Sequence, residues 1–405
     1  MSEINDQADP RTIGQRLTEY RKAANLTQAQ AADHLGMSRP TFIAIEKGLR
    51  EAKPEELVRL AALYGRSLHE IVRTGAEVIA LEPHLRANLD AAEREVDGLA
   101  KTVQALSDLA TDYRELERLL RSRLKVVHPP EVAIPPRGDV QEFAESVAGR
   151  ERARLRLGDG PIHHLRSILE ANVGVRVFYD QMPSGVSGMY AYVAELGYCV
   201  MINRLHPKTR RRLSLAHEYG HFLCDRHKPG IDFLTPTGRK PRNEHFCDAF
   251  AMNFLIPRTG VSQFFHDVVE TSGDFQVADL VRMSDFYEVS LEAATRRLEA
   301  LGLVGKDTWE MLRSQGFSPK RARERLGIPE SPEAAPDLVP ERYRQLAVRA
   351  FEQGLITEGQ LARFLRVDRL TARRIVERES IRDLGSSGQP EEQQARLDFS
   401  LFSER

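Results

Sequence analysis

The pentapeptide 217–221, His-Glu-Tyr-Gly-His, has residue types and a spacing that suit hydrolysis at a bound metal ion. Positions i and i+4 of a helix lie on one face, so His217 and His221 can direct both imidazoles at one Zn²⁺ ion. Glu218 can reach a water held there and accept its proton. Residues 211–216 before the motif contain no helix breaker, so we expect the motif to be helical.

A second predicted helix, over residues 243–257, carries the carboxylates that such a site needs. Its apolar residues keep helical period, and Pro257 ends the run. Glu244 and Asp248 lie four apart on one face, which suits a metal ligand and a second carboxylate that orients an imidazole. The alternative is that neither segment binds a metal. The carboxylates of residues 243–257 would then form a solvated acidic face, and the pentapeptide would lie on a surface helix with two spaced histidines. We favour the metal site because both halves of it are present.

These two segments resemble the ImmA/IrrE family of zinc metallopeptidases. The resemblance covers residues 140–305 and rests on Arg-Arg-Leu-Ser-Leu-Ala-His-Glu-Tyr-Gly-His and on the helix Glu-x-x-Cys-Asp-x-Phe-Ala-x-x-x-Leu-Ile-Pro. At Cys247 and Asp248 the family's pattern instead has a small residue followed by Asn. The resemblance implies a compact zincin-like α+β domain that holds Zn²⁺ and cuts a protein, in this family a helix-turn-helix repressor. It also implies roles for four residues: the ligands His217, His221 and Glu244, and the general base Glu218.

Strands predicted before the pentapeptide fit a peptidase cleft. Residues 175–179 suit a buried strand, and residues 187–195 and 198–203 suit two strands joined at Gly197. An edge strand beside the metal can bind an extended peptide by strand addition. The sequence does not identify the group that would stabilise an oxyanion, and the nearby candidates are Tyr219, His227 and His245.

Near the amino end the chain has the pattern of two helices joined by a tight turn. Thr27 and Gln30 form a capping box for the first helix. Gly36 permits the turn, and Ser38 caps the second helix. Residues 11–73 resemble the Cro/repressor-type (Xre) helix-turn-helix family, whose second helix enters the major groove of double-stranded DNA. This geometry gives four candidate contacts to an operator: Gln28, Ser38, Arg39 and Thr41.

Charge supports DNA binding by this segment only mildly. Residues 11–73 hold eleven Arg and Lys against seven Asp and Glu, a surplus of four. A helical scaffold that binds protein is the alternative. We favour DNA binding because of the motif rather than because of the charge.

Residues 85–124 carry apolar side chains at alternating spacings of three and four, a heptad seam of about five heptads. A single helix with such a seam needs a partner. We expect a homodimer through this seam, because helix-turn-helix proteins of this type bind paired half-sites. Packing of the seam on the peptidase domain is the alternative. Two Pro-Pro steps in residues 127–139 then favour an extended linker, and residues 126–136 are a candidate cleavage site.

The carboxyl end repeats part of the amino-terminal pattern. Residues 357–371 resemble the first helix-turn-helix, with Thr357 and Gln360 as a second capping box. Arg366, however, replaces the turn glycine. We interpret residues 306–384 as a small helical packing or interaction module, with a second helix-turn-helix as the alternative.

The whole chain has 405 residues and a net charge of −1, so no overall charge draws it to nucleic acid or membrane. It has no apolar run of about 18 residues and no signal sequence, so we expect a cytoplasmic protein without membrane contact. Three cysteines without a CxxC pair argue against a disulfide framework. Cys224 and Cys247 each follow a candidate ligand by three residues. We expect them to be small packing residues, with redox-responsive thiols as the alternative.

The sequence therefore predicts a multidomain, mainly α protein with an α+β zincin-like metallopeptidase core. The expected segments are a helix-turn-helix DNA-binding domain (1–75), a coiled-coil dimerisation helix (76–126), a Pro-rich linker (127–139), a zinc metallopeptidase domain (140–305), a C-terminal helical module (306–384) and a flexible tail (385–405). We expect a DNA-binding transcriptional regulator whose gated peptidase cleaves a regulatory protein, itself or a partner repressor, after a signal such as stress. A DNA-binding regulator whose zincin-like domain is a non-proteolytic ligand or metal sensor is the alternative.

Overall fold

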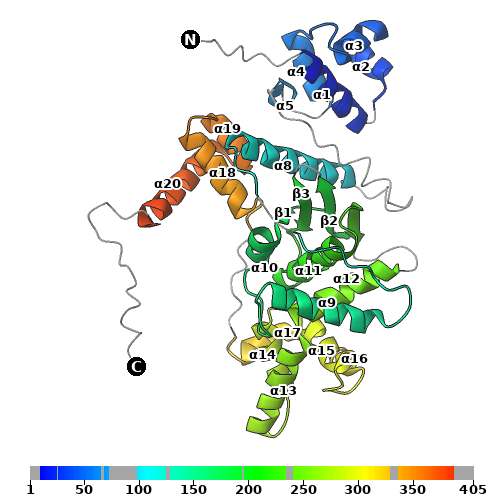
Figure 1. Ribbon diagram of the computed structural model, residues 1–405, viewed down its shortest axis with the longest axis vertical. Helices are drawn as coiled ribbons and strands as arrows, with labels where there is room; N and C mark the ends of the chain where they lie inside the picture. Colours follow the sequence, from blue (N-terminus) through cyan, green and yellow to red (C-terminus); the bar gives the residue numbers. More distant parts are fainter. Residues whose placement is uncertain are drawn as a thin grey trace. The chain divides into compact units, whose positions relative to one another are not determined.

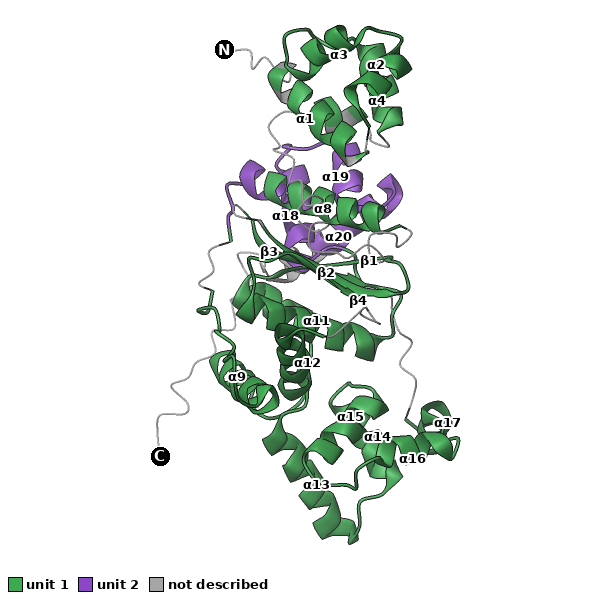
Figure 2. Cartoon of the chain, turned by 90° about the vertical axis from the view of Figure 1, so that its right-hand side faces the viewer, with its two compact units in different colours: residues 1–115, 124–338 green, residues 116–123, 339–405 purple. Residues whose placement is uncertain are grey.

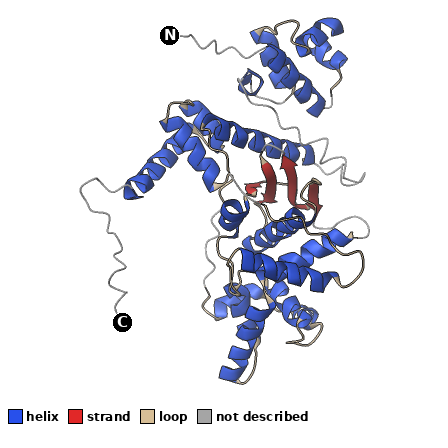
Figure 3. Ribbon diagram, in the orientation of Figure 1, coloured by secondary structure: helices blue, strands red, loops and turns tan. Residues whose placement is uncertain are grey.

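The computed structural model shows a multidomain, mainly helical protein whose described strands form one small mixed sheet (Figures 1 and 3). The predicted fold class is confirmed. Contacts divide the chain into two compact units, residues 1–115 with 124–338 and residues 116–123 with 339–405 (Figure 2). The structure describes residues 10–24, 26–64, 68–72, 98–124, 128–193, 196–233, 240–328 and 336–386.

The amino-terminal bundle consists of short helices around a small core. They are α1 (Pro10–Ala23), α2 (Gln28–Leu35), α3 (Arg39–Glu46), α4 (Pro54–Leu63) and α5 (Leu68–Val72). Thr27 and Gln30 make the expected capping box, and Gly36 adopts a φ of 70° in the turn. Each helix contributes a fully buried side chain: Leu17, Ala31, Phe42, Leu60 and Ile71. Beside this core, Arg21 donates hydrogen bonds of 2.7 and 3.2 Å to the buried Glu46 carboxylate.

The sheet has the strand order β1-β3-β2-β4. Its strands are β1 (Arg176–Asp180), β2 (Val186–Val193), β3 (Gly197–Asn203) and β4 (Gly230–Phe233). β1 runs parallel to β3, whereas β2 is antiparallel to both β3 and β4. The three strands predicted from the sequence are present. β4 is an additional edge strand, and its four residues are too few to show a clear alternation.

Two helices, α11 (Lys208–Cys224) and α12 (Arg242–Leu255), pack against each other, with α9 (Val140–Arg154) on the other side of α12. Aromatic rings hold α11 and α12 together, since the Tyr219 ring centroid lies 5.6 Å from Phe250 and 5.5 Å from Phe254. Such pairs contribute about 0.5–1.5 kcal/mol each beyond their burial. The Tyr219 hydroxyl is bonded to Glu151 and Arg154 of α9, so Tyr219 is a core residue and is not available as an oxyanion donor. The turn of α11 that carries the pentapeptide is thus anchored in the core.

Further helices extend the core on both sides of α11 and α12. They are α10 (Leu165–Ile168), the π-helical turn η1 (Leu169–Val173), α13 (Arg258–Ser272), α14 (Val277–Phe286), α15 (Leu291–Ala300), α16 (Thr308–Ser314) and α17 (Pro319–Arg325). Leu280 and Leu298, before residue 305, and Leu312, after it, join the same apolar cluster as the aromatic rings of α12. The predicted boundary at 305 thus falls between helices that share one core.

Helix α8 (Leu99–Leu119) is the described part of the predicted heptad seam. Its seam residues are buried within this single chain: Leu99, Val103, Leu106, Ala110 and Tyr113. The Tyr113 ring contacts Phe178 of β1 edge to face, with centroids 6.4 Å apart, and the Arg176 guanidinium lies 5.0 Å from its centroid. This part of the seam therefore packs inside the chain, as the alternative interpretation expected. Residues 85–97 lie outside the described residues, and a homodimer through the seam stays a prediction.

The predicted Pro-rich linker has no regular secondary structure over residues 128–139, but it is bonded to the core. The Val132 amide donates to the Leu223 carbonyl at 2.7 Å. Arg242 of α12 donates to the carbonyls of Pro135 and Gly138, both at 2.8 Å. The segment considered as a cleavage site is therefore attached to the domain that would cut it.

The second unit contains α18 (Glu341–Glu352), α19 (Glu358–Leu365) and α20 (Arg369–Ser386), which pack on one another. Arg342 ties α18 to residues 116–123, because it donates to the Glu117 carboxylate and the Ser122 carbonyl, both at 2.6 Å. The compact carboxyl-terminal unit begins at residue 339. Residues 387–405, most of the predicted tail, lie outside the described residues.

Candidate metal centre

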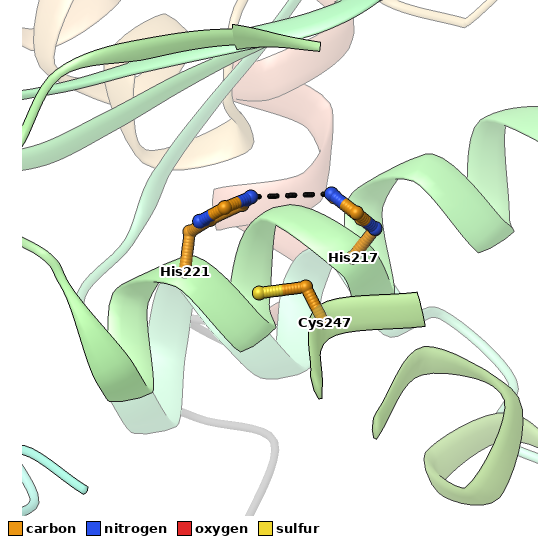
Figure 4. A group of neighbouring side chains, drawn as sticks. All are labelled: His217, His221 and Cys247. Atoms are coloured by element: carbon orange, nitrogen blue, oxygen red, sulfur yellow. Dashed lines mark hydrogen bonds between the residues drawn. The ribbon is translucent and has the colours of Figure 1, made fainter. Parts of the chain in front are cut away.

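Helix α11 places His217 and His221 one turn apart on the same face, and both imidazoles are buried (Figure 4). Their Nε2 atoms lie 3.2 Å apart. From α12, the Glu244 carboxylate reaches both rings. Its Oε2 lies 3.4 Å from His217 Nε2, and its Oε1 lies 3.2 Å from His221 Nε2. The three residues expected to be ligands therefore converge on one point.

Each imidazole is oriented through its other ring nitrogen. His217 Nδ1 lies 3.1 Å from Asp248 Oδ1, and His221 Nδ1 lies 2.9 Å from Asp225 Oδ1. The Asn243 side chain donates to the second Asp225 oxygen at 2.9 Å. Such bonds fix the tautomer that leaves Nε2 available to a metal. Asp248 is the carboxylate predicted for this task, whereas Asp225 is not predicted, although its position four residues after His221 is a signal for it.

Tyr190 of β2 is a second group that sequence reasoning missed. Its ring stacks on the His221 imidazole with centroids 4.7 Å apart, and its hydroxyl lies 3.1 Å from His221 Nδ1. Burial raises the pKa of the hydroxyl far above neutrality, so it remains a protonated donor. In the sequence nothing distinguishes Tyr190 from other aromatic residues of a strand.

The charges of the converging groups depend on one another. Burial opposes protonation of His217, but its bonds to Asp248 and Glu244 prevail and raise its pKa to about 10. Burial also acts to raise the pKa of Glu244, but the bonds from His217 and His221 prevail and hold it well below its usual range. Protons on the imidazoles balance these carboxylates, and a divalent cation can take their place with release of the protons.

Glu218 is fully buried, yet neither of its carboxylate oxygens has a hydrogen-bond partner among the described residues. Burial raises its pKa to about 8. Its Oε1 faces Gly188 of β2 so closely that a Cβ there would lie 2.5 Å away. An unpaired buried polar group costs about 1–3 kcal/mol. The fold therefore holds a destabilising acid in a fixed place, where it is available to a water or a substrate.

The donor set fits a zinc ion, because two imidazole nitrogens and a carboxylate oxygen are ligands of catalytic zinc sites. Asp232 of the edge strand β4 adds a carboxylate, whose oxygen forms a group within 4.8 Å with His217 and Glu244. The Cys247 sulfur forms a similar group with His217 and His221 (Figure 4). Nitrogen, oxygen and sulfur donors thus surround the same point, and β4 runs beside it.

Cys224 and Cys247 lie side by side where α11 meets α12, with Sγ atoms 3.9 Å apart. Cys247 is buried and Cys224 is half-buried. This separation is well beyond that of a disulfide bond. The two thiols therefore pack the helices together, and a redox role for them stays a prediction.

In the amino-terminal bundle the candidate DNA contacts differ in how far they are already engaged. Arg39 is exposed at the first position of α3. Ser38 accepts a hydrogen bond of 3.3 Å from the Thr41 amide, and the two hydroxyls lie 2.7 Å apart. The Gln28 side chain donates to Glu46 at 2.9 Å. Arg39 is therefore the candidate that is most open to a base edge.

Comparison with known proteins identifies both regions. Residues 170–299 match the IrrE N-terminal-like domain of the M78 peptidases, and residues 12–73 match a helix-turn-helix domain family. The chain contains an IrrE-like domain and an amino-terminal helix-turn-helix domain. Over 56 residues the chain is 39% identical to an uncharacterized HTH-type transcriptional regulator, MJ0272, of Methanocaldococcus jannaschii. The aligned segment covers 14% of this chain and 85% of that protein. Both resemblances inferred from the sequence are confirmed.

The protein is thus a DNA-binding regulator with a peptidase-family domain, and the family of that domain suggests a metal. The crystal structure of ComR from Streptococcus suis aligns over 94% of this chain and 96% of its own at 13% identity. Its TM-score of 0.16 is too low to support any structural argument. No helix in the described part of the chain is both long and apolar enough to cross a membrane.

Proposed function

We propose that this protein is a transcriptional regulator whose IrrE-like domain is a zinc-dependent metallopeptidase. The observation that carries the proposal is Glu218, which is buried and lacks a partner among the described residues. It lies next to His217 in α11, where three potential ligands converge. A domain that only senses a metal or ligand has no need of this acid, whose burial lowers stability. Its presence therefore favours catalysis over sensing.

The residues divide the work between holding the metal and moving a proton. The proposed ligands of Zn²⁺ are His217, His221 and Glu244. When bound, zinc supplies Lewis acidity toward a peptide carbonyl and toward a water. Glu218 would accept the proton of that water and deliver it to the leaving amine, because its carboxylate oxygens are buried and have no other partner among the described residues. Asp248 and Asp225 keep the two imidazoles in place.

The edge strand β4 suggests how a substrate binds. Among the described residues β4 pairs only with β2, and its Asp232 lies beside the candidate ligands. An extended peptide segment can therefore add to β4 and pass next to Glu218. The chain's own linker is bonded to the core through Val132 and Arg242. A flexible segment of a partner protein is thus a better substrate than the linker itself.

The test compares wild type, Glu218→Gln and Asp248→Asn, each stripped of metal and then reloaded with Zn²⁺. The probes are the protein itself and a library of peptides from a digested proteome, with new termini identified by mass spectrometry. We expect wild type with zinc to cut, and Glu218→Gln to retain zinc and DNA binding while cleavage falls about 10²–10⁴-fold. Asp248→Asn, the matched control, should lose zinc affinity about 10–100-fold but cut once loaded.

The sensor alternative gives a different pattern. Wild type would hold zinc without producing any new termini, and zinc would alter DNA binding equally in wild type and in Glu218→Gln. That result would reject the peptidase and retain the regulator.

A further inference from the structure

The carboxyl-terminal unit repeats the local geometry of the amino-terminal helix-turn-helix. In α19, the Thr357 amide donates to the Gln360 side chain at 2.7 Å, and the Gln360 amide donates back to Thr357 at 3.3 Å. The corresponding bonds of α2, between Thr27 and Gln30, measure 2.8 and 3.2 Å. The two helices therefore begin with the same reciprocal cap.

The turns after these helices also match. Arg366 adopts a left-handed φ of 57°, where the first motif has Gly36 at 70°. The amide of the next residue, Val367, donates to the Ala362 carbonyl at 3.1 Å, and Met37 makes the equivalent bond at 3.0 Å. A left-handed conformation costs a residue with a side chain about 1–2 kcal/mol. The unit adopts the helix-turn-helix turn in spite of that cost.

The start of the following helix completes the equivalence. Asp368 accepts the Thr371 amide at 3.0 Å, as Ser38 accepts the Thr41 amide at 3.3 Å. The residue after each threonine is fully buried: Ala372 in α20 and Phe42 in α3. The unit thus has both helices of the motif, and Tyr343 of α18 braces it through a 3.0 Å hydrogen bond to the Phe364 carbonyl.

The exposed face of α20 has the chemistry of a nucleic-acid contact. Residues 369–376 contain no acidic residue, and Arg369, Arg373 and Arg374 are all exposed. Between them Leu370 is 59% exposed, an apolar group that suits a thymine methyl. In a helix-turn-helix these first two turns face the major groove and its phosphates.

We propose that residues 341–386 form a second helix-turn-helix that binds double-stranded DNA through the first two turns of α20. Glu358 limits this surface, because it occupies the position of Gln28 and forms bonds of 3.0 and 2.9 Å with Arg373. The carboxylate sits where the motif meets a phosphate, and it holds one of the three arginines. Its removal should therefore strengthen DNA binding.

The experiment uses the full chain and a short mixed-sequence DNA duplex of about three helical turns, with affinity measured by fluorescence anisotropy over a range of salt concentrations. Arg369→Ala with Arg374→Ala should weaken binding about tenfold and reduce the salt slope by about 0.9 per lost phosphate contact. The charge-matched control, Arg150→Ala with Arg313→Ala, removes two exposed arginines outside both helix-turn-helix segments and should leave the slope unchanged. Glu358→Gln should tighten binding severalfold.

Further variants separate loss of DNA contacts from misfolding, and the second motif from the first. Arg369→Lys with Arg374→Lys retains the charges and should bind nearly as wild type, which separates lost contacts from misfolding. Arg39→Ala with Thr41→Ala reports on the amino-terminal motif in the same assay. Equal slopes for the alanine pair and its control, or a preference for an RNA duplex of the same sequence, would overturn the proposal. A response to Arg39 and Thr41 alone would instead make the carboxyl-terminal unit a protein-binding module.

Discussion

The metal centre and the amino-terminal helix-turn-helix place their functional groups in opposite surroundings. His217 is 5% exposed, His221 2% and Glu218 0%, whereas Arg39 is exposed at the first position of α3. Buried groups lack water as a partner, so they set one another's charge and affect the stability of the fold. Exposed groups are nearly neutral for folding and act when a ligand arrives. The same kind of substitution should therefore have different consequences in the two regions.

The largest effect is expected from the loss of a metal ligand in the buried centre. His221→Ala removes one of the three converging groups and leaves Asp225 and Glu244 without their shared partner. We expect zinc affinity, measured by competition with a chelator, to fall much further than the about 10–100-fold loss expected for Asp225→Asn. Equal losses for both variants would mean that His221 does not bind the metal.

The helix-turn-helix also has one buried charged pair, which should behave like the metal centre rather than like the DNA-facing surface. Glu46→Ala leaves Arg21 buried without its carboxylate, since the two side chains are 4% and 9% exposed. Breaking such a pair costs about 3–5 kcal/mol. Hydrogen exchange of the α2 and α3 amides measures this loss. Glu55→Ala, at an exposed position, should change the free energy of unfolding by less than about 0.5 kcal/mol. An equally small change in Glu46→Ala would contradict the expected difference between buried and exposed groups.

Burial of Glu218 should make the metal-free protein sensitive to pH. Burial raises the folded-state pKa of Glu218 from 4.5 to about 8, so the folded state holds a proton that the unfolded state releases. Stability from this group is fully present below pH 4.5 and is lost as pH rises through 8, by up to about 1.4 kcal/mol per unit. Glu218→Gln should not lose stability in this way, because a glutamine side chain does not titrate.

The melting temperature of metal-free Glu218→Gln should therefore rise relative to wild type between pH 5 and 8. Both variants retain the histidines, whose raised pKa values give them a shared pH dependence. A temperature difference that stays constant across this range would show that Glu218 titrates normally.

The contrast in surroundings also explains what the sequence could predict. Spacing of four residues pairs His217 with His221 on one helix and Glu244 with Asp248 on another, because residues four apart on a helix share a face. The caps and the turn glycine identify the first helix-turn-helix for the same reason. These are local patterns, and the structure contains the elements they predict.

Groups that reach the site from another element were missed. Tyr190 and Asp232 lie on β2 and β4, and only the strand order brings these strands beside α11. The fate of the heptad seam was equally hidden, because a row of apolar residues does not specify whether β1 or a second chain covers it. Tertiary contacts of this kind depend on topology, which local periodicity does not determine.

A smaller effect is expected in the turn of the first helix-turn-helix. Gly36 has a φ of 70°, and a Cβ added there would meet no atom within 4 Å. Gly36→Ala should therefore cost only the free energy of placing a residue with a Cβ in the left-handed conformation, about 1–2 kcal/mol. Gly36→Asn, which tolerates the left-handed region, should cost less. Equal rates of amide hydrogen exchange in α2 and α3 for Gly36→Ala and Gly36→Asn would show that backbone strain at this position is not the reason for the glycine.

The smallest effect on folding is expected where the largest effect on DNA binding lies. Arg39→Ala removes an exposed side chain from the start of α3, so the free energy of unfolding should change by less than about 0.5 kcal/mol. Affinity for a selected operator should fall by about 1–3 kcal/mol if Arg39 contacts a base edge. A loss that is the same for operator and for random DNA would make Arg39 a phosphate contact instead. If Arg39→Ala lowers the free energy of unfolding as much as Glu46→Ala does, Arg39 has a structural role. The exposed DNA-facing groups would then not differ from the buried ones in their effect on folding.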